Sequence, residues 1–492
     1  MSGDITAPVS FLELQARLTQ LGGRGLLELE NGTIVVLPSI SFPTSELRKI
    51  IGIERYEERL LCFLLLLRAP ELRMVFVSSA RIDDYIIDHY LSFLDDPEDA
   101  RRRVTFVSLD DEEPRALTEK LLENPAAIEE MRAAIGSPDM GYILPFNVTE
   151  LEKEVAESLG IPVYGPSPAL TVWGTKSGAR QLARDAGVPV LEGSEDLFSV
   201  LDVERATQRV RARRPDAHAV VIKLNNGFSG QGNAIVRIDA LRSPLDSSAT
   251  TFCASEESWP SFTTKIEAEG AIVEEMVKDA AMTSPSVQVG IAPDGSVEIF
   301  STHDQILGGP DDQVYLGCRF PARAEYRSLI TRHAAAIGRA LADRGVIGAF
   351  GIDFVVVPKA DRHDVYLSEI NLRLGGTTHP YLMAKLATGA TYDQDSGELV
   401  AGSHTIAYLA TDNLKSESYV GLEPERIVQA VRAAGLIFDP ATGVGAALHL
   451  LGAAARYGKL GALCIGRGLE AAEEIYTGVV EAVDTLAAEG RQ

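Results

Sequence analysis

The chain has 492 residues, of which 46% are hydrophobic and 24% are charged, so it is long enough for several domains and has the composition of a soluble globular protein. A formal net charge of −24 argues against nucleic acid or an anionic membrane as a partner, because neither tolerates so negative a surface without a basic patch. The longest apolar run, 60–67, is far too short to span a bilayer, and we expect it to form a buried helix.

The four cysteines are scattered along the chain, and no two of them lie at metal-ligand spacing: they are Cys62, Cys253, Cys318 and Cys464. This pattern is typical of reduced, mostly buried thiols. The first residues lack the basic and apolar regions of a signal peptide. We therefore expect a cytoplasmic protein without a membrane or nucleic-acid partner.

The first 170 residues alternate strand-like runs with helical runs, which predicts a parallel α/β domain. Strands are expected at 33–37, 73–78, 103–108 and 141–145, and helices at 56–67, 82–93, 115–122 and 147–159. No glycine-rich fingerprint follows any of these strands, so nothing indicates a dinucleotide-binding domain. Turn-forming residues at 163–168 favour an end to the domain there.

From Thr171 the pattern changes to α+β. A helix is expected at 176–186, strands at 219–223, 231–238, 271–277, 286–290 and 297–300, and helices at 381–390, 424–434 and 469–488. We therefore divide the chain into an α/β domain at 1–170, two lobes at 171–277 and 278–420, and a small helical domain at 421–492.

The most informative segment is a predicted hairpin with arms at 351–357 and 365–373. Because side chains alternate along a strand, Asp353 is expected opposite Glu369, with Asn371 and Arg373 on the same face. Two facing carboxylates repel each other, and a hard divalent cation such as Mg2+ removes that penalty. The alternative is the solvated polar face of an edge hairpin. The glycines at 375–376 and the flanking apolar positions favour the metal site.

Two further segments carry weaker signals for a nucleotide. Lys223 ends a strand and precedes a glycine-containing turn at 225–232, where backbone N–H groups and the lysine can contact phosphates. Glycine-rich turns are common, and the P-loop sequence is absent. Glu274 and Glu275 lie at a strand end where a base could be held, but such a pair also fits an exposed acidic face.

In this order, the helix beginning at Lys176, Lys223 with its turn, the segment 274–277, Asp353 and the Glu-x-Asn-x-Arg strand resemble the ATP-grasp superfamily over residues 171–390. The resemblance implies ATP held between two α+β lobes. The ATP contacts that it implies are Lys176 and Lys223 to phosphates, a lid at 227–232 that includes Gly230 and Gly232, and Glu274, Glu275 and the Val277 backbone to adenine. It also implies two Mg2+ ions on Asp353, Glu369 and Asn371, and Arg373 beside the transferred phosphoryl group or acyl phosphate.

The whole chain is similar, more narrowly, to the pheganomycin-type bacterial peptide ligases, on its layout and on residues 369–380. This resemblance implies ATP-dependent ligation of a small-molecule or peptide carboxylate to an amine through an acyl phosphate, with release of ADP and phosphate; relatives are commonly dimers. Arg373 would stabilise the oxyanion. Two alternatives stay open: a carboxylase or phosphotransfer enzyme with the same ATP site, and a catalytically silent ATP-binding module.

Some positions depart from the ATP-grasp pattern or have two readings. Asp279 stands near the place of the ribose-binding acid of many relatives, and Gly351 stands where some dipeptide-forming relatives have an arginine. His303 is either a base bordering the site or a structural residue. His379 sits just past residues 375–378, which could hold a substrate, but as a histidine before a proline at a helix start it equally fits a structural role.

Overall fold

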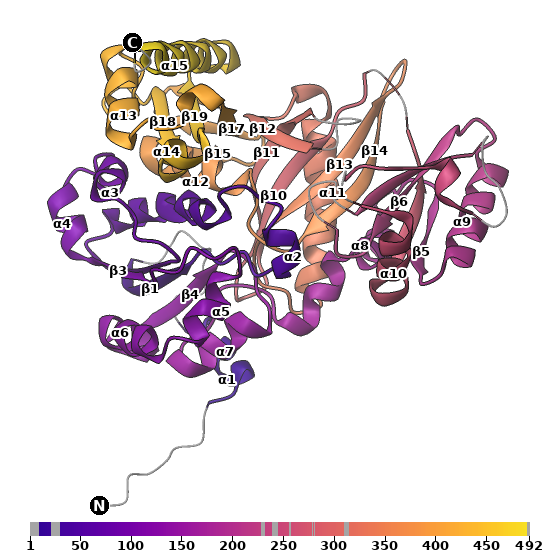
Figure 1. The fold of residues 1–492 in the computed structure, drawn as a ribbon, viewed down its shortest axis with the longest axis horizontal. Helices are drawn as coiled ribbons and strands as arrows, with labels where there is room; N and C mark the ends of the chain where they lie inside the picture. Colours follow the sequence, from indigo (N-terminus) through magenta and orange to yellow (C-terminus); the bar gives the residue numbers. More distant parts are fainter. Residues whose placement is uncertain are drawn as a thin grey trace, which may run out of the picture.

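The computed structural model describes residues 9–20, 30–227, 232–238, 245–254, 257–277, 279, 281–308 and 314–489. These residues form three β-sheets of four, ten and five strands, with helices packed around them. The chain runs from the four-stranded sheet through the five-stranded sheet to the ten-stranded sheet in the centre of the molecule (Figure 1). The mixture of a parallel α/β domain with antiparallel lobes is the fold class that the sequence predicted.

The N-terminal sheet is parallel, in the order β3 (Val104–Ser108), β2 (Glu71–Ser78), β1 (Asn31–Leu37) and β4 (Gly141–Pro145). All four predicted strands are confirmed. The residues of these strands are mostly apolar because helices bury both faces of the sheet. Val35 and Val75 pack towards α5 (Leu117–Leu122), α6 (Pro125–Ile135) and α7 (Glu150–Leu159), whereas Val36 and Phe76 face the main core and α3 (Asp84–Leu91).

The apolar run 60–67 lies in a buried helix, as predicted, but the helix has 3-10 geometry over η1 (Ile53–Arg68). Every residue from Leu60 to Leu67 is buried, which fits a helix surrounded on all sides by protein. On one side it packs against β2 and α3, and on the other against α12 (Thr378–Thr388). This helix therefore joins the N-terminal domain to the central sheet.

The five-stranded sheet belongs to a small lobe with its own hydrophobic core. Its strand order is β5 (Gly193–Leu197), β9 (Ala271–Glu275), β6 (Ala219–Leu224), β7 (Asn233–Arg237) and β8 (Thr250–Phe252), and all described pairings are antiparallel. The lobe carries α9 (Val200–Arg213) and α10 (Trp259–Glu269), while α8 (Lys176–Asp185) lies between it and the central sheet (Figure 1).

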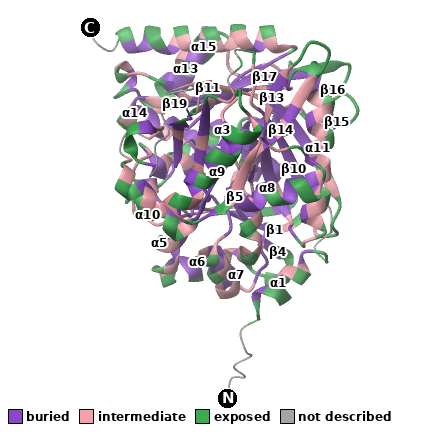
Figure 2. Ribbon diagram, turned by 90° about the vertical axis from the view of Figure 1, so that its right-hand side faces the viewer, coloured by how far each residue is buried: buried purple, intermediate pink, exposed green. Residues whose placement is uncertain are grey.

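The central sheet begins with β14 (His363–Asn371), β13 (Gly348–Pro358), β10 (Pro285–Ile291), β11 (Val297–Gly308), β12 (Val314–Phe320) and β17 (His404–Lys415), and continues through β16 (Glu398–Ala401) and β15 (Thr391–Asp393). The long helix α11 (Ala324–Ala342) packs on β10 and β11. Figure 2 shows β10 and β13 largely buried inside the molecule, whereas α15 (Leu469–Glu489) has both exposed and buried residues at the surface.

The C-terminal segment contains the two predicted helices, α13 (Pro424–Ala433) and α15, together with two strands that the sequence did not predict. β19 (Lys459–Gly466) pairs with β17, and β18 (Gly445–His449) pairs with β19, so both extend the central sheet. The strands are rich in glycine and alanine, residues that are depleted in strands, which is why the pattern did not indicate them. No helix in the described ranges is long and apolar enough to cross a membrane.

The hairpin β13–β14 depends on the core beneath it, where Leu367 is 0% exposed. We expect Leu367→Ala to lower the free energy of unfolding by about 2–5 kcal/mol, because the substitution removes buried methyl groups and leaves a cavity. The measurement is urea denaturation. The control is Leu201→Ala, at a position that is 53% exposed, for which we expect a change within about 0.5 kcal/mol. Equal effects at the two positions would contradict this account.

Candidate active site

The two acidic residues of the hairpin face each other as the sequence predicted. Asp353 on β13 pairs with Glu369 on β14, and the next pair along is Phe354 with Leu367. Ser368 is therefore one extra residue on β14, which is a β-bulge. Bulges re-aim side chains next to active sites, and this one brings Glu369, rather than Ser368, opposite Asp353.

Neighbouring side chains hold the two carboxylates in place. The Asn371 amide donates to Asp353 Oδ2 and to Glu369 Oε1, at 3.0 Å each. The Gln305 amide donates to Asp353 Oδ1 at 2.9 Å, and the Lys176 ammonium pairs with Glu369. The carboxylate oxygens of Asp353 and Glu369 form an oxygen-only donor set, to which Asn371 would add its amide oxygen once its side chain is turned over. Such a set fits a hard divalent cation such as Mg2+.

The electrostatics of the pair also fit a cation. Burial, followed by the charge of Glu369, raises the pKa of Asp353 to about 7. Burial also disfavours ionised Glu369, but the charge and hydrogen bond of Lys176 outweigh it and lower the pKa of Glu369. One carboxylate is thus firmly ionised, while its neighbour resists ionisation until further positive charge is present.

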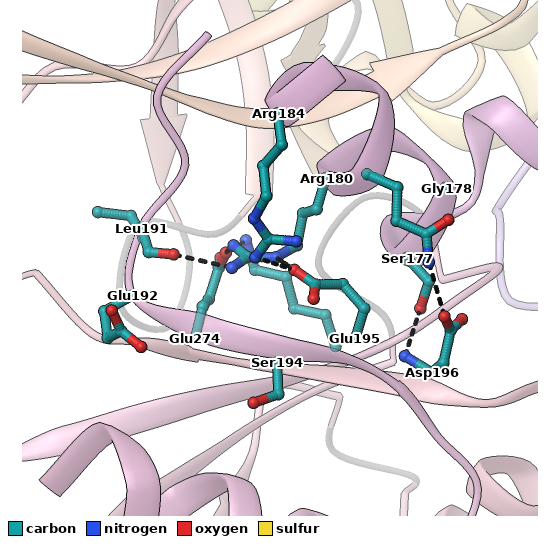
Figure 3. Close-up of polar contacts among 12 residues, drawn as sticks. Ser177, Gly178, Arg180, Arg184, Leu191, Glu192, Ser194, Glu195, Asp196 and Glu274 are labelled. Atoms are coloured by element: carbon teal, nitrogen blue, oxygen red, sulfur yellow. Dashed lines mark hydrogen bonds and ion pairs between the residues drawn. The ribbon is translucent and has the colours of Figure 1, made fainter. Parts of the chain in front are cut away.

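In the small lobe, both glutamates of β9 are buried in ion pairs. Glu274 pairs with Lys223 and accepts from Arg180 at 2.9 Å. Arg180 also donates to Glu195 at 2.6 Å and to the Leu191 carbonyl at 2.8 Å (Figure 3). The carboxylate of Glu275, the next residue, accepts from the Arg214 guanidinium at 2.9 Å and from the Glu192 backbone N–H at 3.2 Å. These bonds fix the end of β9 at the wall of a cavity.

A cavity of about 510 Å3 lies between the hairpin, the small lobe and the N-terminal domain. Its lining contains nine of the eleven residues singled out from the sequence: Lys176, Lys223, Glu274, Glu275, Val277, Asp353, Glu369, Asn371 and Arg373. Gly232 does not line it; its carbonyl accepts from the Leu224 N–H at 2.9 Å, and its φ of +90° suits a turn glycine. Gly230, with part of the expected lid, lies outside the described residues.

Several lining residues could not be found from the sequence. Phe42, Tyr56, Arg59 and Phe146 come from the N-terminal domain, where no local pattern marks them. The reason is tertiary packing, because η1 lies against α12 and so brings residues of the N-terminal domain to the central part of the molecule. His303, by contrast, was singled out from the sequence but does not line the cavity. It is 0% exposed, and its Nε2 lies 2.6 Å from the Tyr408 hydroxyl. Its role is structural.

Arg373 has the position expected of a group that acts on an anion. Its guanidinium lies over the Phe42 ring, 5.4 Å from the centroid, and within the described part of the chain it makes no ion pair. Burial lowers its pKa, while the charges of Glu369 and Asp353 oppose that shift. The positive charge is therefore directed into the cavity rather than neutralised by a fixed partner.

Comparison with known proteins agrees with this geometry. A family described as IQCH-like, ATP-grasp matches residues 244–395, and a PGM1 C-terminal domain family matches residues 426–490. The chain is 32% identical over 453 residues to an L-propargylglycine–L-glutamate ligase of Streptantibioticus cattleyicolor, covering 90% of this chain and 92% of that protein. The chain belongs to the ATP-grasp ligases. As a member, it is an enzyme that uses ATP and Mg2+ to join a carboxylate to an amine.

Solved structures of other ATP-grasp enzymes share the fold. The biotin carboxylase domain of 2-oxoglutarate carboxylase from Hydrogenobacter thermophilus has a TM-score of 0.55 at 13% identity, covering 91% of this chain and 89% of that one. An N5-carboxyaminoimidazole ribonucleotide synthetase has a TM-score of 0.53 at 14% identity, covering 94% and 99%. An IQ motif-containing protein H of Danio rerio is 20% identical over 397 residues, 70% of this chain and 37% of that protein.

The raised pKa of Asp353 predicts how stability changes with pH in the ligase without Mg2+. Because protonated Asp353 is favoured in the folded state, its contribution is complete below the unfolded pKa of about 4 and is lost as pH rises through about 7. Asp353→Asn stays neutral, so we expect it to gain Tm over the wild type as pH rises from about 5.5 to about 8.5. The gain should shrink when Mg2+ is added, because the cation offsets the repulsion in the wild type.

The measurement is thermal denaturation of both proteins across that pH range, with and without Mg2+. Asp361→Asn, in the exposed turn of the same hairpin, is the control and should follow the wild type. If the wild type and Asp353→Asn showed parallel curves, the acid pair would not carry the repulsion described above.

Proposed function

We propose that this ligase forms an amide bond between two amino acids, or between an amino acid and a short peptide, through an acyl phosphate. One observation carries the proposal: a single cavity holds the acid pair with Asn371, two lysines, the free guanidinium of Arg373 and the β9 end. The relative from Streptantibioticus cattleyicolor, which is named for two amino acid substrates, supports the substrate class.

ATP fits the side of the cavity formed by the small lobe. The backbone at Met276 and Val277 lies at the cavity wall just beyond the fixed glutamates, and it would receive the adenine. Lys176 and Lys223 border the path from this wall to the hairpin and would contact the phosphates. Asp353, Glu369 and Asn371 would hold Mg2+, which when bound neutralises charge on the phosphoryl oxygens.

The other side of the cavity suits the amino acid substrates. Aromatic rings of Phe42, Tyr56 and Phe146 line it together with the guanidinium of Arg59. Arg59 itself lies over the rings of Tyr56 and Phe146, at 4.7 and 5.4 Å from their centroids. The rings fit an apolar part of a compact substrate, while the guanidinium of Arg59 is itself paired with Asp412 at 3.3 Å.

The reaction needs positioning and electrostatic stabilisation but no protein nucleophile. A substrate carboxylate oxygen attacks the γ-phosphorus, the bond to the β–γ bridging oxygen breaks, and ADP leaves. The amine nitrogen of the second substrate then attacks the acyl carbon, and phosphate leaves with the former carboxylate oxygen. Arg373, beside the acid pair, would stabilise the charge that develops on the phosphoryl group and on the acyl oxygen.

The acid pair gives the first test of this proposal. We expect ADP release from Mg·ATP to require two substrates from a panel of amino acids and short peptides, with a product whose mass is their sum minus water. Asp353→Asn and Glu369→Gln should each lower kcat by about 100-fold or more, because each removes a negatively charged carboxylate that would bind the metal ion. Asp361→Asn, in the hairpin turn, should keep full turnover. Persistent turnover in both acid-pair variants would contradict the metal assignment.

Arg373 gives a test of the catalytic step. We expect Arg373→Met to lower kcat by about 100–1000-fold while changing the KM for ATP little, because its charge acts on groups that develop in the reaction. The measurement is steady-state kinetics with product detection by mass spectrometry. Arg362→Met, at the other end of the same hairpin, is the matched control and should leave kcat and the KM for ATP unchanged. A large rise in KM for ATP with unchanged kcat would instead assign Arg373 to ground-state binding.

A further inference from the structure

A second cluster of ligand-type side chains lies beside the cavity, and the ATP-grasp reaction as described above does not use it. It consists of His379 at the start of α12, Asp412 in β17 and His449 at the end of β18. All three are buried, with exposed fractions of 4%, 6% and 5%. Three separate elements of the fold therefore bring these side chains together at one point.

The three ligand atoms lie very close together. His449 Nε2 is 2.8 Å from Asp412 Oδ1, His379 Nε2 is 3.2 Å from the same oxygen, and the two Nε2 atoms are 3.2 Å apart. If each ring donated an Nε2–H to this one oxygen, the two hydrogens would crowd each other. A tetrahedral zinc ion at about 2.0–2.1 Å from each atom would separate the ligand atoms by roughly 3.3 Å, close to the observed spacings.

The backbone around the cluster departs from regular sheet structure at two places. β17 has a bulge at Asp412 and Asn413, between the pairs Thr411–Ala462 and Leu414–Leu460. Leu450, directly after His449, has a left-handed φ of +53°, which is unfavourable for leucine. Such departures cost free energy, and their coincidence at one point indicates that the fold maintains this geometry.

A glycine makes room for the cluster. Gly461 of β19 pairs with His449, and a Cβ added at Gly461 would lie 2.1 Å from His449 Nε2. Any larger residue at 461 would therefore displace the imidazole from its present position. The other carboxylate oxygen of the cluster is also engaged, since Asp412 Oδ2 accepts from Arg59 at 3.3 Å, which leaves Oδ1 turned to the two rings. Carboxylate ligands of metals are commonly oriented by such second partners.

We infer that His379, Asp412 and His449 form a binding site for a divalent transition-metal ion, zinc in particular. Two imidazole nitrogens and one carboxylate oxygen suit borderline ions such as Zn2+, whereas the oxygen-only set of the hairpin suits Mg2+. Because Arg59 offsets the charge of Asp412, the three protein ligands leave the charge of the ion largely unbalanced. An anionic oxygen would therefore be a favourable fourth ligand. Because Asp412 lines the cavity while the two histidines do not, the ion would sit at the substrate end of the cavity wall.

The test is zinc binding by the full-length protein, measured apart from its activity. The protein is stripped with a chelator, saturated with Mg2+ so that the hairpin acids are occupied, and titrated with Zn2+ by calorimetry. We expect one tightly bound Zn2+ per chain in the wild type, in Asp353→Asn and in His404→Gln, whose histidine is exposed. We expect His379→Gln and His449→Gln each to weaken binding by about 100-fold or more, since even second partners of ligands contribute about 10–100-fold.

A spectroscopic measurement on the wild type covers the case in which a variant fails to fold. Co2+ in place of Zn2+ should give the intense visible absorption of a tetrahedral site with nitrogen ligands, and excess Zn2+ should remove it. Weak absorption typical of six oxygen ligands would overturn the proposal. So would the absence of tight Zn2+ binding in the presence of Mg2+, or equal binding by the wild type and both histidine variants. In those cases the cluster is a hydrogen-bonded network around Asp412.

Discussion

The repulsion between Asp353 and Glu369 is the constraint around which the rest of the site is arranged. Two carboxylates on facing strand positions are unfavourable on their own, and the chain keeps them together with an amide from Asn371, an amide from Gln305 and an ammonium from Lys176. These groups come from β14, β11 and α8. The acid pair thus links the large lobe to α8 and sets where a cation, and with it the phosphates of ATP, can be bound.

The charged side chains around the cavity fall into two groups: those bonded to a carboxylate of the protein, and those available to a substrate. Arg180 is engaged with Glu274, Glu195 and the Leu191 carbonyl, so it holds the wall of the cavity. Among the described residues Arg373 has an aromatic neighbour and no ion-pair partner, so its charge stays available to a substrate. The same distinction explains why one arginine is expected to act in the reaction and the other to maintain the geometry around it.

Much of this could be predicted from the sequence where the signal is local. The strands of the parallel sheet are continuous apolar runs, and the two arms of the acidic hairpin stand out as strand-like segments on either side of a turn. The bulge at Ser368 could not be read from the pattern, although it decides which residue faces Asp353. The roles of Tyr56 and Arg59 were also hidden, because they depend on how η1 is placed against a sheet formed some 300 residues later. The β18 and β19 strands were missed because their glycines and alanines serve close packing around His449 and the neighbouring strands.

The separate core of the small lobe has a consequence for motion. One continuous core unites a face of the N-terminal sheet, η1, the central sheet and the C-terminal strands, and it includes Leu182 of α8. The lobe from β5 to β9 packs around a different core. Relative movement without loss of packing is therefore easiest between these two bodies, and Arg180, which is rooted in the first and bonded to Glu195 and Glu274 of the second, lies at the pivot. Lys176 would stay with the acid pair during such a rotation, while Lys223 would travel with the lobe, so the two lysines would approach a nucleotide from bodies that hinge against each other.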